Sequence, residues 1–418
     1  MNNVYLCIDF KTFFASVECV ERGLDPFSTN LVVADESIGN GTICLAITPR
    51  MKMLGIRNRC RLYEIPKEVK YIVAKPRMEK YIEYAANIYA IYLKYIAKED
   101  IHVYSIDESF LDVTHYLKTY KMKAIELAKV IMKDIFDTYG ITSTCGIGTN
   151  LYLAKIALDI MSKHSVTNIG WLTEERYQKE LWHHRPLSDF WQIGSGIERR
   201  LNKYRIFDQY DIAHTDPKIL YKEFGVNAEF LIDHAWGRES CTIQDIKNYK
   251  PKSTSVSNSQ ILFEDYDFKK AEIVLKEMIE IKSLELVEKD LVAGSVSLYI
   301  GYSKDLARAT GGVEKLLKPT NVFSELDKTF MNIYYRTTYK NVPIRRIGIS
   351  LGNVSQREYE QLDLFVNQEK VEKERNLERA ISSVKNKMGK NSILRGMSYQ
   401  EGATARVRNT LIGGHNGS

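Results

Sequence analysis

The sequence predicts a multidomain protein of the α/β and α+β classes. The chain has 418 residues, more than one compact core usually holds, so about three or four units are expected. Buried-strand patterns alternate with amphipathic helical patterns over residues 1–165 and again over 254–352. Hydrophobic residues make up 44% and charged residues 27% of the chain, which is an ordinary balance for a globular protein in water.

Several features predict a cytoplasmic protein with no membrane partner. The longest apolar runs, such as LVVA at 31–34, are much shorter than the roughly 20 residues that span a bilayer. The first residues, MNNVYLCIDF, lead directly into a strand pattern without the basic segment of a secretion signal. The six cysteines form no CxxC pair, and we expect free structural thiols. The net charge of +6 permits a nucleic-acid partner but does not require one.

The first predicted unit, residues 1–165, has the element order of a split βαβ fold with helices on one side of a sheet. VYLCI at 4–8 is an unbroken apolar run, typical of a strand buried on both faces, and TFFASVECVERG after it has helical spacing. The further expected elements, in order, are a strand at NLVVAD, a turn between short strands at SIGNGTICLAIT, a helix at 76–97, two strands meeting near Asp107 and Glu108, a helix at 121–138, a strand at STCGIG and a helix at 150–163.

For the remainder of the chain the sequence predicts short helices followed by a linker, then a second α/β unit, and then a polar tail. Residues 167–240 are short helical pieces, and the polar stretch TIQDIKNYKPKSTSVSNSQ lacks apolar periodicity, as expected of a linker. A second α/β unit is predicted over 254–352. The polar tail beyond it contains one amphipathic helix and ends in IGGHNGS, which is expected to be disordered. The residues that would share the apolar face of this helix are Leu377, Ile381, Val384 and Met388.

Three carboxylates are candidates for a catalytic metal site. Asp9 ends the first strand, and Asp107 and Glu108 lie at the tip of a hairpin that could lie beside it. Converging carboxylates repel one another unless cations lie between them, and Mg²⁺ prefers oxygen ligands that it shares with substrate phosphates. Two such ions can activate an attacking hydroxyl and stabilise a leaving pyrophosphate. Taken alone, however, the adjacent pair Asp107 and Glu108 is more simply explained as two solvated carboxylates than as metal ligands.

Three ordered motifs favour the metal site over solvated carboxylates. CIDFKTFFASVE at 7–18, YSIDESFLDV at 104–113 and TCGIGTNLYLAKIALDIMSK at 144–163 together resemble the Y-family DNA polymerases, the translesion enzymes of the DNA polymerase IV and V type. The similarity runs in order from residue 4 to about 352, and the form TPRMK is most similar to the UmuC/UvrX-type branch. It implies a right-hand polymerase with a ferredoxin-like palm (1–10 and 76–166), small fingers (11–75), a helical thumb (167–240), a linker (241–253), an α/β little finger (254–354) and a C-terminal tail (355–418).

The resemblance also implies the reaction and its cofactors. The expected activity is template-directed, low-fidelity synthesis on primer–template DNA from dNTPs, during the SOS response to DNA damage. Asp9, Asp107 and Glu108 would bind two Mg²⁺ ions, and the carbonyl of Phe10 would be a further metal ligand.

Contacts with the nucleotide are implied on two elements. Phe14, next to Phe13, matches the steric-gate position, whereas the residues alone favour two core rings in the first helix. Lys155 of the AKIA motif would reach the triphosphate, whereas the residues alone offer a Lys155–Asp159 pair on one helix.

The fingers depart from the family pattern. Pro49 lies where many relatives have a tyrosine, and Lys52 lies at the position of an arginine. Lys52 keeps the charge but not the bidentate fork. The hydrogen bond of the tyrosine is then either lost or supplied by Thr48 or Arg50.

Two segments are candidates for binding DNA phosphates. Gly194 and Gly196 form a G-x-G turn that opens a helix and resembles a helix-hairpin-helix, whose backbone amides can bind phosphate. Arg345 and Arg346 lie in the predicted little finger, where ordinary surface charge is the alternative.

A short peptide after the little finger predicts a protein partner. Gln361, Leu362, Leu364 and Phe365 match the Q-L-x-L-F form of the bacterial sliding-clamp-binding peptide, whose Leu and Phe fill an apolar pocket. Packing of Leu364 and Phe365 back onto the little finger is the alternative. The resemblance further implies a nucleoid-associated location and SOS accessory proteins as partners.

Two other functions remain open from the sequence. A nucleotide cyclase-like palm enzyme would use the same kind of sheet and metal-binding acids. A non-catalytic DNA-binding repair accessory would keep the fold alone. The aromatic gate and the clamp peptide argue against the first, and the intact Asp9, Asp107 and Glu108 argue against the second.

Overall fold

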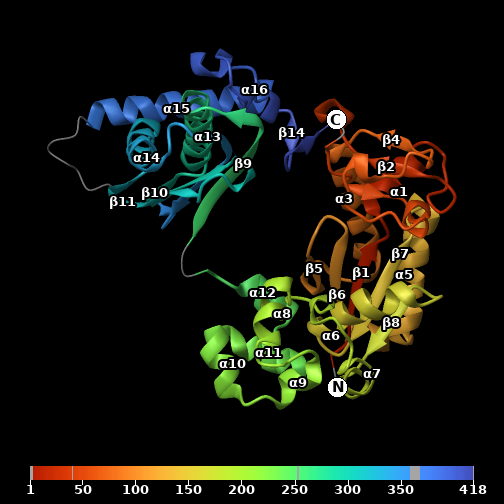
Figure 1. Ribbon diagram of the computed structural model, residues 1–418. Helices are drawn as coiled ribbons and strands as arrows, with labels where there is room; N and C mark the ends of the chain where they lie inside the picture. Colours follow the sequence, from red (N-terminus) through yellow and green to blue (C-terminus); the bar gives the residue numbers. More distant parts are fainter. Residues whose placement is uncertain (1–2, 40, 252–253, 358–367, 418) are drawn as a thin grey trace. The chain divides into compact units, whose positions relative to one another are not determined.

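The computed structural model describes residues 3–39, 41–251, 254–357 and 368–417, and the chain divides into two compact units (Figure 1). The first unit comprises Met1–Tyr249 with His415–Ser418, and the second comprises Lys250–Gly414. The division at Lys250 falls inside the predicted linker. Within the described ranges, no helix has both the length and the apolar composition that a membrane crossing requires.

The first unit is built on a five-stranded sheet in the order β5-β6-β1-β7-β8. The central strand β1 is antiparallel to β6 and to β7, and β8 is parallel to β7. The strand bounds are β1 (Tyr5–Phe10), β5 (Ile101–Val103), β6 (Glu108–Asp112), β7 (Ser143–Gly148) and β8 (Ile169–Leu172). The predicted strands are confirmed, but the sheet continues past residue 166, where the palm was predicted to end, because β8 pairs with β7.

Helices cover both faces of this sheet, so the prediction of helices on one side is wrong. Leu6 and Ile8 of β1 belong to a core with α1, α3 and α5. The alternate residues Tyr5 and Cys7 point to the opposite face, where they pack against α6 and α12. The helix bounds are α1 (Phe13–Val20), α3 (Met78–Tyr95), α4 (Tyr116–Tyr120), α5 (Ala124–Tyr139), α6 (Leu151–Ile156) and α12 (Ile243–Asn248).

Helix α12 replaces the first part of the predicted linker. Thr242 and Asp245 form a reciprocal capping box at its start, with Thr242 N donating to Asp245 Oδ2 at 2.9 Å. Ile243 is 2% exposed and packs with Tyr5 and Cys7. Ile243 and the partly buried Ile246 are too few apolar residues to produce a clear periodic pattern, and for this reason the polar sequence predicted a linker.

Two smaller regions complete the first unit. A three-stranded sheet in the order β3-β2-β4 carries the short helix α2, and the region after β8 is a cluster of short helices, as predicted. Their bounds are β2 (Leu31–Val33), β3 (Ala46–Ile47), α2 (Pro49–Met53), β4 (Ile72–Ala74), α7 (Glu174–Leu181), α8 (Ser195–Asn202), α9 (Gln209–His214), α10 (Pro217–Phe224) and α11 (Ala228–Ala235).

The second unit is a sheet in the order β11-β10-β12-β9, with β13 paired to β10 and helices α13 and α14 packed on one face. Ile347 and Ile349 of β12 point into this core, whereas Gly348 and Ser350 line the opposite, polar face. The bounds are β9 (Ser255–Tyr266), α13 (Phe268–Glu288), β10 (Leu291–Tyr302), β11 (Thr310–Thr320), α14 (Phe323–Thr337), β12 (Ile344–Gly352) and β13 (Ser355–Gln356).

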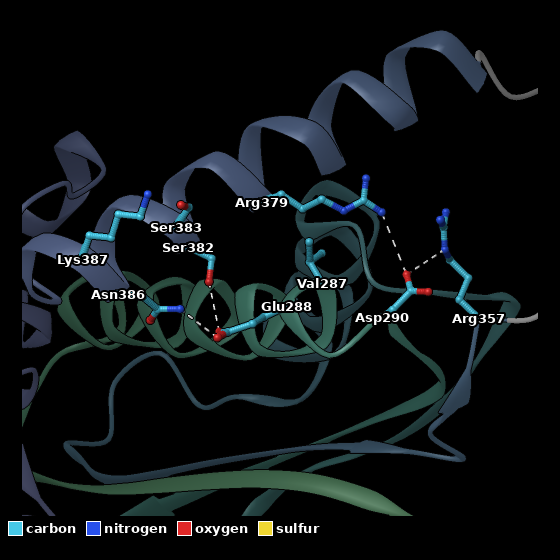
Figure 2. Close-up of a pocket in the computed structure, with 9 residues that line it drawn as sticks. All are labelled: Val287, Glu288, Asp290, Arg357, Arg379, Ser382, Ser383, Asn386 and Lys387. Carbon is cyan, nitrogen blue, oxygen red and sulfur yellow. Dashed lines mark hydrogen bonds and ion pairs between the residues drawn. The ribbon is translucent and has the colours of Figure 1, made fainter.

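The predicted tail also folds, as α15 (Gln368–Met388), α16 (Ala405–Arg408), β14 (Leu411–Ile412) and β15 (His415–Asn416). The predicted apolar face of α15 is wrong, because Leu377 is 58% and Met388 75% exposed. The helix instead buries polar residues against α13. Figure 2 shows Ser382 and Asn386 directed at Glu288, to which they donate at 3.0 and 2.8 Å.

The last residues are ordered, contrary to prediction. Asn416 Nδ2 donates to the Pro76 carbonyl at 3.1 Å. Glu79 N, in the first turn of α3, donates to the Gly417 carbonyl at 2.8 Å. Because α3 leaves its first amides without helical partners, an external carbonyl is a suitable acceptor there.

Candidate active site

Strand register brings the three predicted acids to one end of the central sheet. Asp9 of β1 lies directly opposite Glu108 of β6, and Phe10 N donates to the Asp107 carbonyl at 3.0 Å. The backbone amides of Tyr104 and Ser105 both donate to the Glu108 carbonyl at 3.0 Å, which closes the predicted hairpin turn. Asp9 and Glu108 share the sheet face of Cys7, the face covered by α6.

Each of the three carboxylates has a different environment. Glu108 is 8% exposed and accepts from Lys155 Nζ at 2.8 Å and Cys7 Sγ at 3.1 Å. Asp107 accepts from Ser105 Oγ at 2.6 Å. Asp9 has no such side-chain partner recorded in the described part of the chain.

The electrostatics of Asp9 indicate an excess of negative charge. Burial, followed by repulsion from Asp107 and Glu108, raises the pKa of Asp9 to about 7, although Lys163 and Lys155 offset part of this rise. A cation close to Asp9 would relieve this repulsion.

The donor set fits a hard divalent cation, since carboxylate oxygens are the ligands that Mg²⁺ prefers. The oxygens do not form a finished cage: across the ranges that the structure describes, no three Asp, Glu, His or Cys side chains are close enough to hold an ion. The reason lies in Glu108, whose two oxygens are directed to Lys155 and Cys7. An arriving cation would therefore have to share Glu108 with Lys155.

Two glycines of β7 allow α6 to lie directly on the sheet. A Cβ at Gly146 would lie 2.0 Å from the Ala154 carbonyl oxygen, and one at Gly148 would lie 2.1 Å from Ala154 N. No side chain can occupy these positions unless the helix moves. The glycines thus fix the turn of α6 that carries Lys155 against the acidic end of the sheet.

Lys155 is paired with two carboxylates in this structure. Its side chain is 9% exposed, and Nζ lies 2.8 Å from Glu108 Oε2 and 3.0 Å from Asp159 Oδ2. Burial lowers the pKa of Lys155, but Asp159 and Glu108 raise it more strongly, so that it lies above its usual range. Lys155 thus neutralises a candidate metal ligand, and its contact with a triphosphate stays a prediction.

Lys163 is a candidate that the sequence analysis missed. Its side chain is 51% exposed, and Nζ lies 3.1 Å from Asp159 Oδ1. Lys163 also lowers the pKa of Asp9 more than Lys155 does. The signal was present in the sequence, because Asp159 lies four residues from each lysine. A π-helical turn, Ala157–Met161, separates the two.

The two predicted gate-region rings differ in their exposure. Phe13 is 2% exposed and its ring belongs to the core, so its nucleotide contact stays a prediction. Phe14 is half-buried and stacks on Tyr81, with ring centroids 4.4 Å apart and an interplanar angle of 14°. Tyr81 in turn donates to the fully buried Glu18 at 2.7 Å. Tyr81, itself fixed by Glu18, therefore holds the Phe14 ring in one orientation. A steric gate requires a ring that is fixed in this way.

In the fingers, the prediction for Thr48 is wrong and that for Lys52 is still open. Thr48 is fully buried, and its hydroxyl donates to the Thr29 carbonyl at 2.7 Å. Lys52 lies within electrostatic range of Asp9: burial and Lys163 lower the pKa of Lys52, whereas Asp9 raises it.

The candidate phosphate contacts of Gly194 and Gly196 remain accessible. Gly194 is the N-cap of α8 and Gly196 lies in its first turn. Neither has a positive φ, and a Cβ on either would meet nothing within 4 Å. Neither backbone conformation nor packing within the protein explains these glycines, which is compatible with a close external partner.

The two arginines of β12 differ. Arg345 pairs with Asp265 at 3.6 Å, as the surface-charge alternative expects. Arg346 is exposed on the polar face of the second unit, with its guanidinium 5.5 Å from the centroid of the Tyr299 ring. The clamp-binding candidates Gln361, Leu362, Leu364 and Phe365 lie outside the described residues.

Comparison with protein families and curated proteins gives consistent results. The impB/mucB/samB family matches residues 8–159, and the C-terminal domain of that family matches residues 253–364. A Bacillus subtilis (strain 168) protein named "Putative UV-damage repair protein UvrX" is 32% identical over 98% of this chain and 97% of its own length. A protein named DNA polymerase IV 2 from the same organism is 30% identical over 99% of this chain and 98% of its own length.

A solved structure shows the same fold. The Y-family DNA polymerase chimera Dbh-Dpo4(243-245)-Dbh has a TM-score of 0.65 and 24% identity, over 84% of this chain and 99% of that chain. Together with the mixed α/β and α+β sheets, this likeness confirms the predicted fold class.

The glycine contacts generate a stability prediction. We expect Gly146→Ala to lower the free energy of unfolding by about 1–3 kcal/mol or more, because the added methyl group collides with the backbone of α6. The control is Gly41→Ala, where a Cβ meets nothing within 4 Å and φ is not positive. Urea denaturation of both variants measures the difference. Equal effects would show that α6 does not lie at backbone distance from β7.

Proposed function

The chain belongs to the impB/mucB/samB family of Y-family translesion polymerases and is a DNA-directed DNA polymerase of DNA repair, and we propose that it works by two-metal nucleotidyl transfer at Asp9, Asp107 and Glu108. The primer 3′-hydroxyl attacks the α-phosphorus of a dNTP and pyrophosphate leaves. The observation that carries this proposal is the register that sets Asp9 opposite Glu108 and Asp107 beside Phe10.

Divalent metal use follows from the family, and Mg²⁺ fits the oxygen donors of this site. Asp9, Asp107 and Glu108 would hold the ions, with the carbonyl of Phe10 as a further ligand. When bound, the ions supply electrophilic stabilisation of phosphoryl oxygens. The chain's own contribution is to pair Glu108 with Lys155 and to orient Asp107 through Ser105.

Substrate contacts are assigned from charge and position. Lys52 and Lys163 provide ammonium groups near Asp9 for the triphosphate, and Phe14 excludes a 2′-hydroxyl. The amides that open α8 at Gly194 and Gly196, together with Arg346, would contact phosphates of the primer–template.

Recruitment by the sliding clamp rests on the sequence of residues 361–365. In the chain the peptide lies between β13 and α15, and its Leu and Phe suit an apolar pocket on a partner. SOS accessory proteins remain a proposal from the family.

The nucleotide cyclase alternative has little support, because the relatives named as polymerases match along nearly the whole chain. A non-catalytic accessory would not require the placement of Asp9, Asp107 and Glu108 at one sheet end.

Replacement of Asp107 tests the metal site. We expect Asp107→Asn to lower the rate of Mg²⁺-dependent primer extension by about two orders of magnitude or more, because loss of a direct ligand should cost at least as much as loss of its supporting groups. Primer extension on an undamaged template measures the rate, with the surface variant Asp137→Asn as the control. Retained extension in Asp107→Asn would reject the metal site, and cyclisation of a nucleoside triphosphate without extension would favour the cyclase.

Replacement of Phe14 tests the sugar gate. Phe14→Ala should raise the ratio of ribonucleotide to deoxynucleotide incorporation by about ten- to a hundredfold, because the clash with the 2′-hydroxyl is removed. Single-nucleotide incorporation with dCTP and CTP measures the ratio. The exposed ring of Phe27 provides the matched Phe27→Ala control. An unchanged ratio in Phe14→Ala would assign this ring to packing alone.

Deletion of residues 361–365 tests clamp recruitment. The shortened chain should keep its basal extension rate but lose the stimulation that the bacterial sliding clamp gives the full chain. Extension on a primed circular template, with and without loaded clamp, separates the two. Loss of basal extension as well would indicate that Leu364 and Phe365 pack on the second unit.

A further inference from the structure

A fourth lysine, Lys11, lies at the acidic end of the sheet and has no role in the reaction proposed above. Lys11 comes directly after β1, two residues beyond Asp9. Its backbone is fixed on both sides, with Lys11 N donating to the Thr142 carbonyl at 2.9 Å and its own carbonyl accepting from Ser16 Oγ at 2.7 Å. The next residue, Thr12, has a left-handed φ of 48°. The side chain therefore leaves the sheet in a defined direction.

The ammonium of Lys11 is half-buried and is matched only by a neutral group. Nζ donates to Asn168 Oδ1 at 2.6 Å, and this is its one partner recorded among the residues that the structure describes. Asn168 is itself fixed, because its carbonyl accepts from Cys145 N at 2.9 Å and its φ is 59°. A partly buried cation held by an amide oxygen lacks a counter-ion. Such a group is suited to an anion that arrives during function.

Besides Lys155, which is paired with Glu108, three lysines come to the acidic end of the sheet from different elements, and Lys11 is one of them. Lys52 comes from α2 and Lys163 from the 3₁₀ turn Ser162–His164. Both Lys163 and Lys11 act electrostatically on Lys52, and Lys163 acts on Asp9, so the three ammonium groups lie in one neighbourhood. Asp159 partners Lys163 but makes no recorded contact with Lys11 in the described part of the chain.

We propose that Lys11 is a specificity-determining contact for the triphosphate of the incoming nucleotide. It supplies a third positive charge beside those of Lys52 and Lys163. Ammonium groups are point charges, so three of them can neutralise a polyphosphate without the planar fork of arginine. Asn168 is the positioning residue that keeps Lys11 directed at the site. The inference rests on the proposed polymerase function.

The competing explanation is structural, namely that the Lys11–Asn168 hydrogen bond only joins the end of β1 to the turn before β8. The two explanations differ in what a change of Lys11 affects. A substrate contact alters the binding of triphosphate and pyrophosphate. A structural link alters stability alone.

Single-nucleotide incorporation by the full chain, on undamaged primer–template, tests the proposal. Lys11→Ala should raise the KM for dNTP about ten- to a hundredfold, as expected for loss of a charged hydrogen bond, with less than about a threefold change in kcat. Lys11→Arg should restore the KM to within about threefold, and Lys11→Met should behave as Lys11→Ala. Inhibition by inorganic pyrophosphate should weaken in parallel. The control is Lys118→Ala on the exposed helix α4.

The outcomes separate this proposal from the proposed function. If the unchanged chain extends primers but Lys11→Ala keeps its KM and its pyrophosphate inhibition, the role of Lys11 is overturned and the polymerase function stands. A lower thermal midpoint with unchanged KM overturns the role of Lys11 in the same way. If the unchanged chain does not extend primers, both are overturned. A raised KM that Arg restores and Met does not would establish the contact.

Discussion

The ion pair between Lys155 and Glu108 joins helix α6 to the acidic end of the central sheet, and the rest of the site is arranged around it. Two carboxylates that oppose each other across β1 and β6 would repel, and a buried unpaired carboxylate is costly. Lys155, whose Nζ lies 2.8 Å from Glu108 Oε2, compensates the negative charge of Glu108 and so reduces the repulsion between the two carboxylates. The pair is possible only because Gly146 and Gly148 let α6 approach β7 to backbone distance.

Lys155 and Lys163 share Asp159 as a partner but differ in their surroundings. Asp159 contacts both Lys155 and Lys163, at 3.0 and 3.1 Å, so one carboxylate orients two cations from one helix. The π-helical turn between them changes the phase of the helix, and such turns often lie at functional sites. Lys155 stays buried beside Glu108, while Lys163 remains half-exposed near Asp9. The protein thereby keeps one cation inside for its own carboxylate and leaves the other accessible to solvent.

The sequence was sufficient for features that depend on local pattern. Strand β1, helix α3 and the hairpin before Glu108 follow from apolar runs and periodicity, and strand pairing then brings Asp9 to Glu108. Residue roles that depend on partners distant in sequence were not accessible in this way. Thr48 was expected to face a substrate, yet its hydroxyl bonds to the carbonyl of Thr29 across the small sheet. Nothing in the TPRMK motif reveals that partner.

Helix α15 shows why apolar periodicity can select the wrong face. Its sequence offers Leu377 and Met388 as a packing stripe, but α13 presents Ser283 and Glu288 to it. Burying the apolar stripe there would leave these polar groups without partners, a penalty comparable to the gain from one buried side chain. Pairing Ser283 with Glu378 and Glu288 with Ser382 avoids that penalty. The surface of the neighbouring helix, more than the helix's own pattern, thus determines which face is buried, and at Glu108 the same rule gives a buried carboxylate a buried lysine as its partner.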